Sequence, residues 1–329
     1  MELPSVAETR RLQRELLQFF QEQRRDLPWR NNPTPYQVWV SEVMLQQTRV
    51  EVVKDYYRRW MQAFPDIQSL AGAAEDDVLR LWQGLGYYSR ARRLAQGARF
   101  VLEQYDGAVP AEPEELLKIP GIGPYSAGAI ASIAHGRAAP LVDGNVIRVL
   151  CRRFGLFGDP TRAPLQKEIW RLAAHLVPRK APGDFNQALM ELGATVCTPR
   201  QAQCFHCRLR KDCRALSAGA VDRLPELPPR KKPQVRTFVV FIFRYRRQVG
   251  LLRAGEGSRW WAGLHCFPLF EVAQLNPHLS SLAAQAKKGR QFLLPGSGDA
   301  RMADLKQLTP ATYSAALGWC YREANRIEV

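Results

Sequence analysis

The chain has 329 residues, enough for one large domain or two of ordinary size, each with a buried core. Hydrophobic residues make up 46%, as in soluble globular proteins, and no apolar run approaches the roughly 18 residues that a membrane span needs. Forty-seven Lys and Arg against 31 Asp and Glu give a net charge of +16, which favours a polyanionic partner without separating DNA from RNA or an acidic membrane surface.

The first two thirds of the chain predict a mainly α-helical domain. Apolar residues recur at helical spacing from Arg11 to Gln23, which gives this segment one buried face. No strand-like alternation interrupts the region, and Pro or Gly residues separate the periodic segments. The helices that we expect cover residues 11–23, 36–60, 75–82, 89–105, 114–119, 124–135, 145–154, 164–176 and 184–197.

A glycine hairpin joins two of these helices at residues 117–128. Gly121 and Gly123 would let the backbone approach a phosphate, and a helix that starts at Pro124 would offer free N–H groups to that anion. Asp143 follows twenty residues after Gly123 and would face a nucleic acid held there. A plain helical hairpin followed by a solvated aspartate explains these residues equally well when they are taken alone.

Two carboxylates have neighbours that suit acid and electrostatic catalysis. Cleaving a base from its sugar creates an oxocarbenium-like transition state, which a carboxylate such as Asp143 can stabilise. Glu42 stands among Trp39, Val43 and Met44, so burial would raise its pKa into the range of a general acid. An isolated glutamate on an amphipathic helix is more often simply solvated.

Four cysteines lie close together in a short loop. Their spacing is C-x6-C-x2-C-x5-C, and such a set of thiolates indicates a metal or iron–sulfur site. From the spacing alone, zinc and a [4Fe–4S] cluster are equally good interpretations. The predicted ligands are Cys197, Cys204, Cys207 and Cys213.

The composition changes after this loop. Residues 224–233 are rich in proline and basic side chains, which is typical of a stiff linker, and we place the linker at residues 217–234. Residues 235–245 and 249–253 are β-branched and aromatic, as in strands. We therefore divide the chain into a helical domain (1–216), the linker, and a small α/β domain (235–329).

Three further segments narrow the family. Residues 26–30 (DLPWR), 41–48 (SEVMLQQT) and 81–90 (LWQGLGYYSR), together with the hairpin and the cysteine loop, resemble the MutY family of the endonuclease III superfamily. This similarity runs from about residue 12 to 216. It implies a helix-hairpin-helix DNA glycosylase fold, made of a six-helix domain and an iron–sulfur cluster domain, and it favours a [4Fe–4S] cluster over zinc.

The resemblance also implies a reaction and its residues. MutY enzymes are monofunctional glycosylases that hydrolyse the glycosidic bond of adenine opposite 8-oxoguanine, or opposite guanine, after the base has flipped out of the duplex. Glu42 matches the acid that protonates adenine N7, and Asp143, helped by Asn145, matches the residue that stabilises the sugar cation. Tyr125 stands where bifunctional relatives carry a Schiff-base lysine, so strand cleavage should be absent or weak, and its phenol can hydrogen-bond Glu42 or the sugar site.

The same matches to the family predict which residues contact the DNA and the flipped adenine. Trp29 matches a residue of the adenine pocket, but a place in the hydrophobic core explains this aromatic residue equally well. Gln47 and Tyr87 match residues that enter the duplex near the flipped base, while the amides of Gly121 and Gly123 and the side chain of Arg200 would contact phosphates. The positions that match the family's adenine pocket are Arg25, Trp29, Arg30, Leu45, Val50 and Gln187.

The C-terminal residues resemble the opening strands of the family's Nudix-like domain. They contain no Nudix box, so pyrophosphate hydrolysis is not expected. Members of the family recognise 8-oxoguanine through a Phe-Ser-His segment. This chain has residues 308–315 (LTPATYSA) in that region, contains no Phe-Ser-His, and ends soon afterwards. We therefore expect a truncated or divergent domain.

The sequence allows two other functions, each less well supported. A bifunctional endonuclease III-like glycosylase and lyase is disfavoured by Tyr125, and a non-catalytic iron–sulfur DNA-binding module is disfavoured by Glu42 and Asp143 in intact motifs. We expect a monomer that binds mismatched double-stranded DNA and does not bind a membrane. The sequence contains no motif that identifies a protein partner. The chain opens without a basic, apolar signal, so we expect an intracellular protein, in the cytoplasm or nucleoid of a bacterium or the nucleus of a eukaryote.

Overall fold

The computed structural model describes residues 2–229, 238–240, 243–245, 248–255, 265–267 and 269–271. These residues belong to two compact units, Met1–Pro229 and Arg230–Val329, which are described separately.

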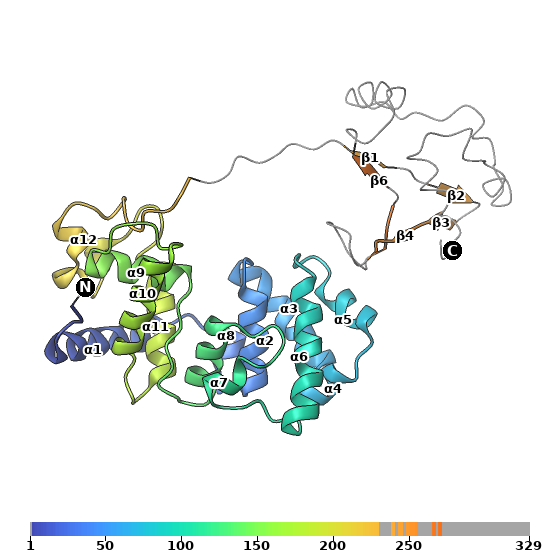
Figure 1. The fold of residues 1–329 in the computed structure, drawn as a ribbon, viewed down its shortest axis with the longest axis horizontal. Helices are drawn as coiled ribbons and strands as arrows, with labels where there is room; N and C mark the ends of the chain where they lie inside the picture. The colour runs from blue at the N-terminus through green and yellow to red at the C-terminus, as the bar shows by residue number, and fades with distance from the viewer. Residues whose placement is uncertain are drawn as a thin grey trace. The chain divides into compact units, whose positions relative to one another are not determined.

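The first unit is built from helices, as the sequence predicts (Figure 1). Three short 3-10 helices, at Pro28–Arg30, Cys204–His206 and Arg210–Asp212, and one π-helical turn at Ile130–Ala134 complete its regular structure among the described residues. The α-helices are α1 (Val6–Gln23), α2 (Pro35–Leu45), α3 (Val50–Ala63), α4 (Ile67–Ala71), α5 (Glu75–Trp82), α6 (Ser89–Tyr105), α7 (Pro113–Leu116), α8 (Pro124–Ala129), α9 (Gly144–Phe154), α10 (Ala163–Leu176), α11 (Pro182–Thr195) and α12 (Arg214–Ser217).

Apolar faces hold these helices in two groups. The first helix, α1, lies against α11 and joins α9 and α10, so residues from both ends of the unit share one core (Figure 1). Leu16, Leu150 and Phe185 are fully buried there. In the second group, Trp60 of α3 and Trp82 of α5 meet edge to face with ring centroids 5.4 Å apart. Burial of such large side chains is the main source of stability for each group.

The helix predicted over residues 36–60 is two helices, and that prediction was wrong at its centre. The chain turns between α2 and α3, where Gln47 has a positive φ of 58°. Arg90, from α6, fills the end of α2: its Nη1 donates to the carbonyl oxygens of Val43 (2.8 Å), Met44 (3.2 Å) and Gln46 (2.6 Å). These carbonyls are the ones that a helix end leaves without partners.

The predicted helix over residues 124–135 is also interrupted, because α8 passes into the π-helical turn Ile130–Ala134. Gly128 explains the packing of this turn. A Cβ atom at that position would lie 1.9 Å from the carbonyl oxygen of Pro140. Only glycine therefore lets α8 approach the extended residues that lead to Asp143, which begins α9 as its N-cap.

Part of the predicted linker packs on the helical unit. Arg152 donates from Nε to the carbonyl oxygen of Leu224 (2.8 Å), and Glu226 accepts from the backbone N–H of Gly158 (2.7 Å). The first compact unit accordingly extends to Pro229.

The described residues of the second unit form three antiparallel strand pairs. β1 (Phe238–Val240) pairs with β6 (Leu269–Glu271), β2 (Phe243–Tyr245) with β3 (Gln248–Gly250), and β4 (Leu252–Arg253) with β5 (His265–Cys266). Residues 308–315 lie outside the described part of the chain, so the Nudix-like interpretation of residues 235–329 stays a prediction. Across the described residues, none of the helices combines the length and the apolar character required to span a membrane.

Candidate active site

One cavity of about 590 Å³ in the first unit collects most of the residues singled out from the sequence. It lies among α2, α8, α9 and α11 and the segments that lead into α2 and α3. Its volume is typical of a site for a small molecule or an extruded base. The predicted site residues that line it are Arg25, Trp29, Arg30, Glu42, Leu45, Gln47, Val50, Tyr125, Asp143, Asn145 and Gln187.

Glu42 is the buried acid of this cavity. It faces inward from α2 with 5% of its surface exposed, and the hydroxyl of Tyr125 donates a hydrogen bond to its Oε2 atom. Burial raises the pKa of Glu42 to about 7, the nearby charge of Asp143 adds to the rise, and the Tyr125 hydrogen bond and Arg30 oppose it. Burial and the charge of Glu42 also raise the pKa of Tyr125 well above its ordinary value, so the phenol stays a donor. The carboxyl group can therefore carry a proton near neutral pH.

Asp143 is held from two sides at the start of α9. Its Oδ1 accepts from the backbone N–H of Val146 (2.7 Å), and its Oδ2 accepts from Nδ2 of Asn145 (2.8 Å). Asn145 in turn accepts at Oδ1 from Nη2 of Arg148 (2.8 Å). Burial raises the pKa of Asp143, and these hydrogen bonds oppose the rise. A carboxylate fixed in this way keeps its position when charge develops beside it.

Trp29 is both a core residue and part of the cavity wall, the two positions that the sequence allows for it. It is 6% exposed and meets Tyr57 edge to face with centroids 5.4 Å apart, and it also lines the cavity. Its ring is therefore a rigid wall supported from behind by α3.

Gln47 and Tyr87 occupy two neighbouring loops at the surface. Both have positive φ, 58° and 48°, and Tyr87 is 65% exposed. Arg90 ties the loops together, since it binds the carbonyl of Gln46 (2.6 Å) and, from Nη2, that of Gly86 (3.1 Å). Its guanidinium carbon also lies 5.7 Å from the centre of the Tyr87 ring.

The hairpin and Arg200 do not line the cavity. Gly121 has a φ of 87°, which favours glycine, and Gly123 is the N-cap of α8 with Pro124 in the first turn. Arg200 is exposed in the cysteine loop. Their predicted contacts with phosphates stay a prediction.

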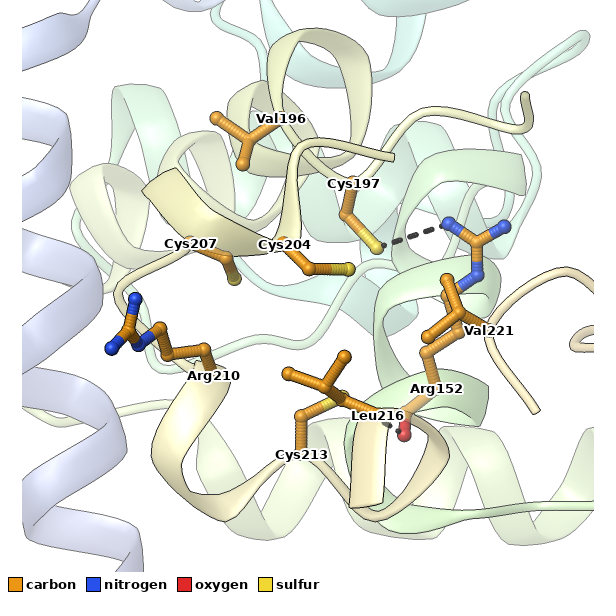
Figure 2. Close-up of a pocket in the computed structure, with 9 residues that line it drawn as sticks. All are labelled: Arg152, Val196, Cys197, Cys204, Cys207, Arg210, Cys213, Leu216 and Val221. Atoms are coloured by element: carbon orange, nitrogen blue, oxygen red, sulfur yellow. Dashed lines mark hydrogen bonds between the residues drawn. The ribbon is translucent and has the colours of Figure 1, made fainter. Parts of the chain in front are cut away.

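The four predicted cysteine ligands line one small pocket (Figure 2). The sulfur atoms of Cys197, Cys204 and Cys207 lie along one side of it, and that of Cys213 lies opposite. Arg152, 3% exposed, donates from Nη1 to Sγ of Cys197 (3.4 Å). Within the described part of the chain, no group of three or more His, Cys, Asp or Glu side chains is arranged to hold a single metal ion.

Sequence reasoning missed Glu191 and Arg148. Glu191 lines the cavity and is 1% exposed, and Arg148 lies behind Asn145, where its Nε also reaches the carbonyl oxygen of Cys197 (2.6 Å). One feature of the sequence could have revealed Glu191. It is a charged residue on the apolar face of a predicted helix, between Leu189 and Leu192, and such a residue is usually buried with a partner.

Known DNA repair proteins are similar to this chain in sequence. Residues 40–175 match the HhH-GPD superfamily of base excision DNA repair proteins. The adenine DNA glycosylase of Schizosaccharomyces pombe is 42% identical over 326 residues, covering 81% of this chain and 71% of that protein. The adenine DNA glycosylase of Rattus norvegicus is 50% identical over 232 residues, covering 68% of this chain and 45% of that protein. The chain thus spans less than half the length of its rat relative.

Solved structures share the fold of the helical unit. A thermostable thymine-DNA glycosylase matches with a TM-score of 0.59 and 31% identity, covering 64% of this chain and 97% of that one. A trapped endonuclease III–DNA covalent intermediate matches with a TM-score of 0.56 and 21% identity, covering 66% and 99%, and shows likeness of fold alone. The helix-hairpin-helix fold is therefore confirmed, and the chain belongs to the adenine DNA glycosylase family.

Proposed function

We propose that this protein is a monofunctional DNA glycosylase that hydrolyses the N-glycosidic bond of adenine in mismatched double-stranded DNA. The observation that carries the proposal is the meeting of Glu42, Tyr125 and Asp143 in one cavity. The relatives named adenine DNA glycosylase support the choice of base. Adenine opposite 8-oxoguanine or guanine is the substrate we propose, acted on by a monomer within the compartment that holds the genome.

The adenine leaves the duplex before the reaction, because its glycosidic bond is out of reach while the base is stacked. The cavity is large enough to receive it, and Trp29, Leu45 and Val50 give apolar walls against which a base can stack. Gln47 and Tyr87, on loops joined by Arg90, would fill the space that the base vacates. Hairpin amides and Arg200 would hold the phosphates.

Glu42 supplies the proton. With a pKa of about 7 it is largely protonated at slightly acidic pH and still partly protonated at neutral pH, and it gives this proton to N7 of adenine as the bond to the sugar breaks. The electron pair of the broken bond stays with the base, which leaves as neutral adenine. The sugar carbon becomes positively charged.

Asp143 stabilises that positive charge from its fixed position at the start of α9. Water then adds to the sugar carbon and gives a proton back to the ionised Glu42, and an abasic site remains in an unbroken strand. Tyr125 has no amine with which to form an imine to the sugar, so the enzyme should not cut the strand.

We propose that the cysteine pocket holds a [4Fe–4S] cluster. Four cysteines line this one small pocket, and four thiolates are the ligand set that such a cluster takes. The thiolates of Cys197, Cys204, Cys207 and Cys213 would hold it, and Arg152 would offset their negative charge. Iron–thiolate bonds would fix the shape of the loop that presents Arg200.

A single-turnover assay on a duplex with one adenine opposite 8-oxoguanine tests the proposal. We expect release of free adenine and a strand that breaks only after treatment with alkali. Breakage without alkali would indicate a lyase, and binding without release would indicate a non-catalytic DNA-binding module. Guanine in place of 8-oxoguanine measures the preference for the opposing base.

A further inference from the structure

The cavity wall contains a buried carboxylate that the proposed reaction does not use. Glu191, on α11, is 1% exposed and lines the cavity beside Arg25 and Arg30. Its neighbours in the helix, Leu189 and Leu192, are core residues. A charge in such a place is costly unless partners satisfy it.

Both oxygens of Glu191 are fully engaged by the two arginines. Oε1 accepts from Nε of Arg25 (2.7 Å) and from its backbone N–H (3.2 Å). Oε2 accepts from Nη2 of Arg25 (3.0 Å) and from Nη2 of Arg30 (2.8 Å). Burial alone would raise the pKa of Glu191, but the hydrogen bonds from Arg25 and Arg30 outweigh it and lower that pKa. With its acceptor sites filled, this group stays ionised and is not free to bind a base or move a proton.

The two arginines differ in how firmly the rest of the protein holds them. Arg30 also donates from Nη1 to the carbonyl oxygen of Arg25 (3.0 Å) and lies 5.2 Å over the ring of Phe20. The side chain of Arg25 is 37% exposed, and Glu191 is its ion-pair partner. A phosphate of bound DNA would compete for such a guanidinium.

On the basis of the proposed function, we infer that Glu191 is a positioning residue for adenine recognition. It holds the guanidinium groups of Arg25 and Arg30 against the cavity wall and away from DNA phosphates, so that an extruded purine meets hydrogen-bond donors already in place. Pre-organised groups spare the cost of orienting them during the reaction.

If Glu191 has this role, its loss should slow adenine release without weakening the affinity for DNA. In Glu191→Gln, which keeps the size of the side chain and removes its charge, Arg25 is released toward the DNA. The single-turnover rate of adenine release at saturating enzyme should fall about 10- to 100-fold. Affinity for the same duplex carrying a 2′-fluorinated adenosine, which resists cleavage, should stay equal or become tighter. General damage to the fold would weaken both quantities.

Matched variants complete the test. Glu168→Gln makes the same change at an ion pair with Arg171 on α10, outside the cavity, and should leave rate and affinity as in the wild type. Arg25→Gln should lower the rate by itself, and adding Glu191→Gln should lower it by less than about 3-fold more, because coupled residues are not additive. If Glu191→Gln does not fold, Glu191→Asp, whose shorter side chain cannot reach both arginines, is measured with the same expectations.

The inference is overturned if Glu191→Gln releases adenine within about 2-fold of the wild-type rate. It is also overturned if the rate of the double variant falls by the product of the two single-variant factors, because Glu191 would then act independently of Arg25. Either result would leave the proposed function intact, because the wild type would still release adenine. If neither the wild type nor Glu168→Gln releases adenine, the proposed function is wrong and the positioning role is rejected with it.

Discussion

Burial of the Glu42 carboxyl sets the acid–base chemistry of the cavity. Its neighbours Trp39, Val43 and Met44 allowed a raised pKa to be predicted from the sequence, because burial disfavours the ionised form whatever the detailed packing. The structure adds the hydrogen bond from Tyr125, which opposes the rise. The position of that phenol depends on contact between α2 and α8, residues 83 apart in the chain.

The ion pairs of Glu191 could not be predicted from the sequence. Its partners Arg25 and Arg30 lie more than 160 residues earlier in the chain. The position of Glu191 on the apolar face of α11 hints at its burial, but no local pattern specifies which distant residues pack against it, so its ion pairs cannot be read from the sequence of α11. The pocket residues carried over from the family did converge on one cavity, although their individual roles stay predictions.

Adenine release should depend on pH through Glu42 and respond to Tyr125. The folded pKa of about 7 lies above the ordinary 4.5, so the proton-donating form is present below about pH 7 and is lost as the pH rises through that value. The rate should therefore decline above about pH 7. In Tyr125→Phe the hydrogen bond that lowers the Glu42 pKa is gone, so this decline should move to higher pH. Single-turnover rates between pH 5 and pH 9 measure it.

Tyr105→Phe is the matched control, because Tyr105 also donates to a glutamate, Glu115, but away from the cavity. Its pH profile should equal that of the wild type. A Tyr125→Phe decline that stays in place, or that moves to lower pH, would contradict the assignment of Glu42 as the acid.

Helix ends were less predictable than helices. Apolar residues recur at helical spacing on both sides of Gln46–Arg49, and no Pro or Gly marks a turn between residues 36 and 60, so the sequence predicts one helix there. The turn at Gln46–Gln47 exists because Arg90, more than forty residues later, supplies donors to the carbonyls at the end of α2. Tertiary hydrogen bonds of this kind override local propensity.

Gly128 controls how closely α8 approaches the segment before Asp143. In Gly128→Ala the new Cβ would meet the Pro140 carbonyl oxygen at 1.9 Å, so the free energy of unfolding of the helical unit should fall by about 2 kcal/mol or more. Adenine release should slow as well, because Asp143 is displaced. Urea unfolding and the single-turnover rate give the two quantities.

Gly72→Ala serves as the comparison for Gly128→Ala. Its Cβ would find ordinary contact at 3.5 Å, and its unfolding free energy should change by less than about 1 kcal/mol. Equal stability of the two variants would show that the approach of α8 to Pro140 does not need a glycine.

The whole chain carries a strong excess of positive charge. A net charge of +16 suits a nucleic acid partner, and we propose that the hairpin and the cysteine loop bind its phosphates. Composition could predict the class of partner but not its sequence or lesion. The strand pairs of the second unit agree with the predicted change to β structure after residue 235, while its recognition function stays a prediction.

Loss of one cysteine ligand should affect DNA binding as well as iron content. Cys204→Ser removes a thiolate from the pocket, so the purified protein should contain much less iron and sulfide, and the loop that carries Arg200 should lose its shape. Affinity for duplex DNA should fall by about tenfold or more. Iron analysis and a binding titration at fixed salt measure both effects.

Cys266→Ser, in β5 and outside the pocket, should keep its iron and its affinity. A Cys204→Ser protein that is full of iron and binds DNA as tightly as the wild type would refute the ligand assignment.

We propose above all that Asp143 and Glu42 form a hydrolytic centre for the glycosidic bond of adenine. The most direct measurement compares adenine release by wild type and Asp143→Asn on one mismatched duplex in a single turnover, with the affinity for that duplex measured alongside. Asp143→Asn keeps its shape beside Val146 and Asn145 but loses the charge that stabilises the sugar cation. We predict release by the wild type, a rate at least about 1,000-fold lower in Asp143→Asn, and affinities within about 3-fold of each other. Release by Asp143→Asn at the wild-type rate would contradict the account.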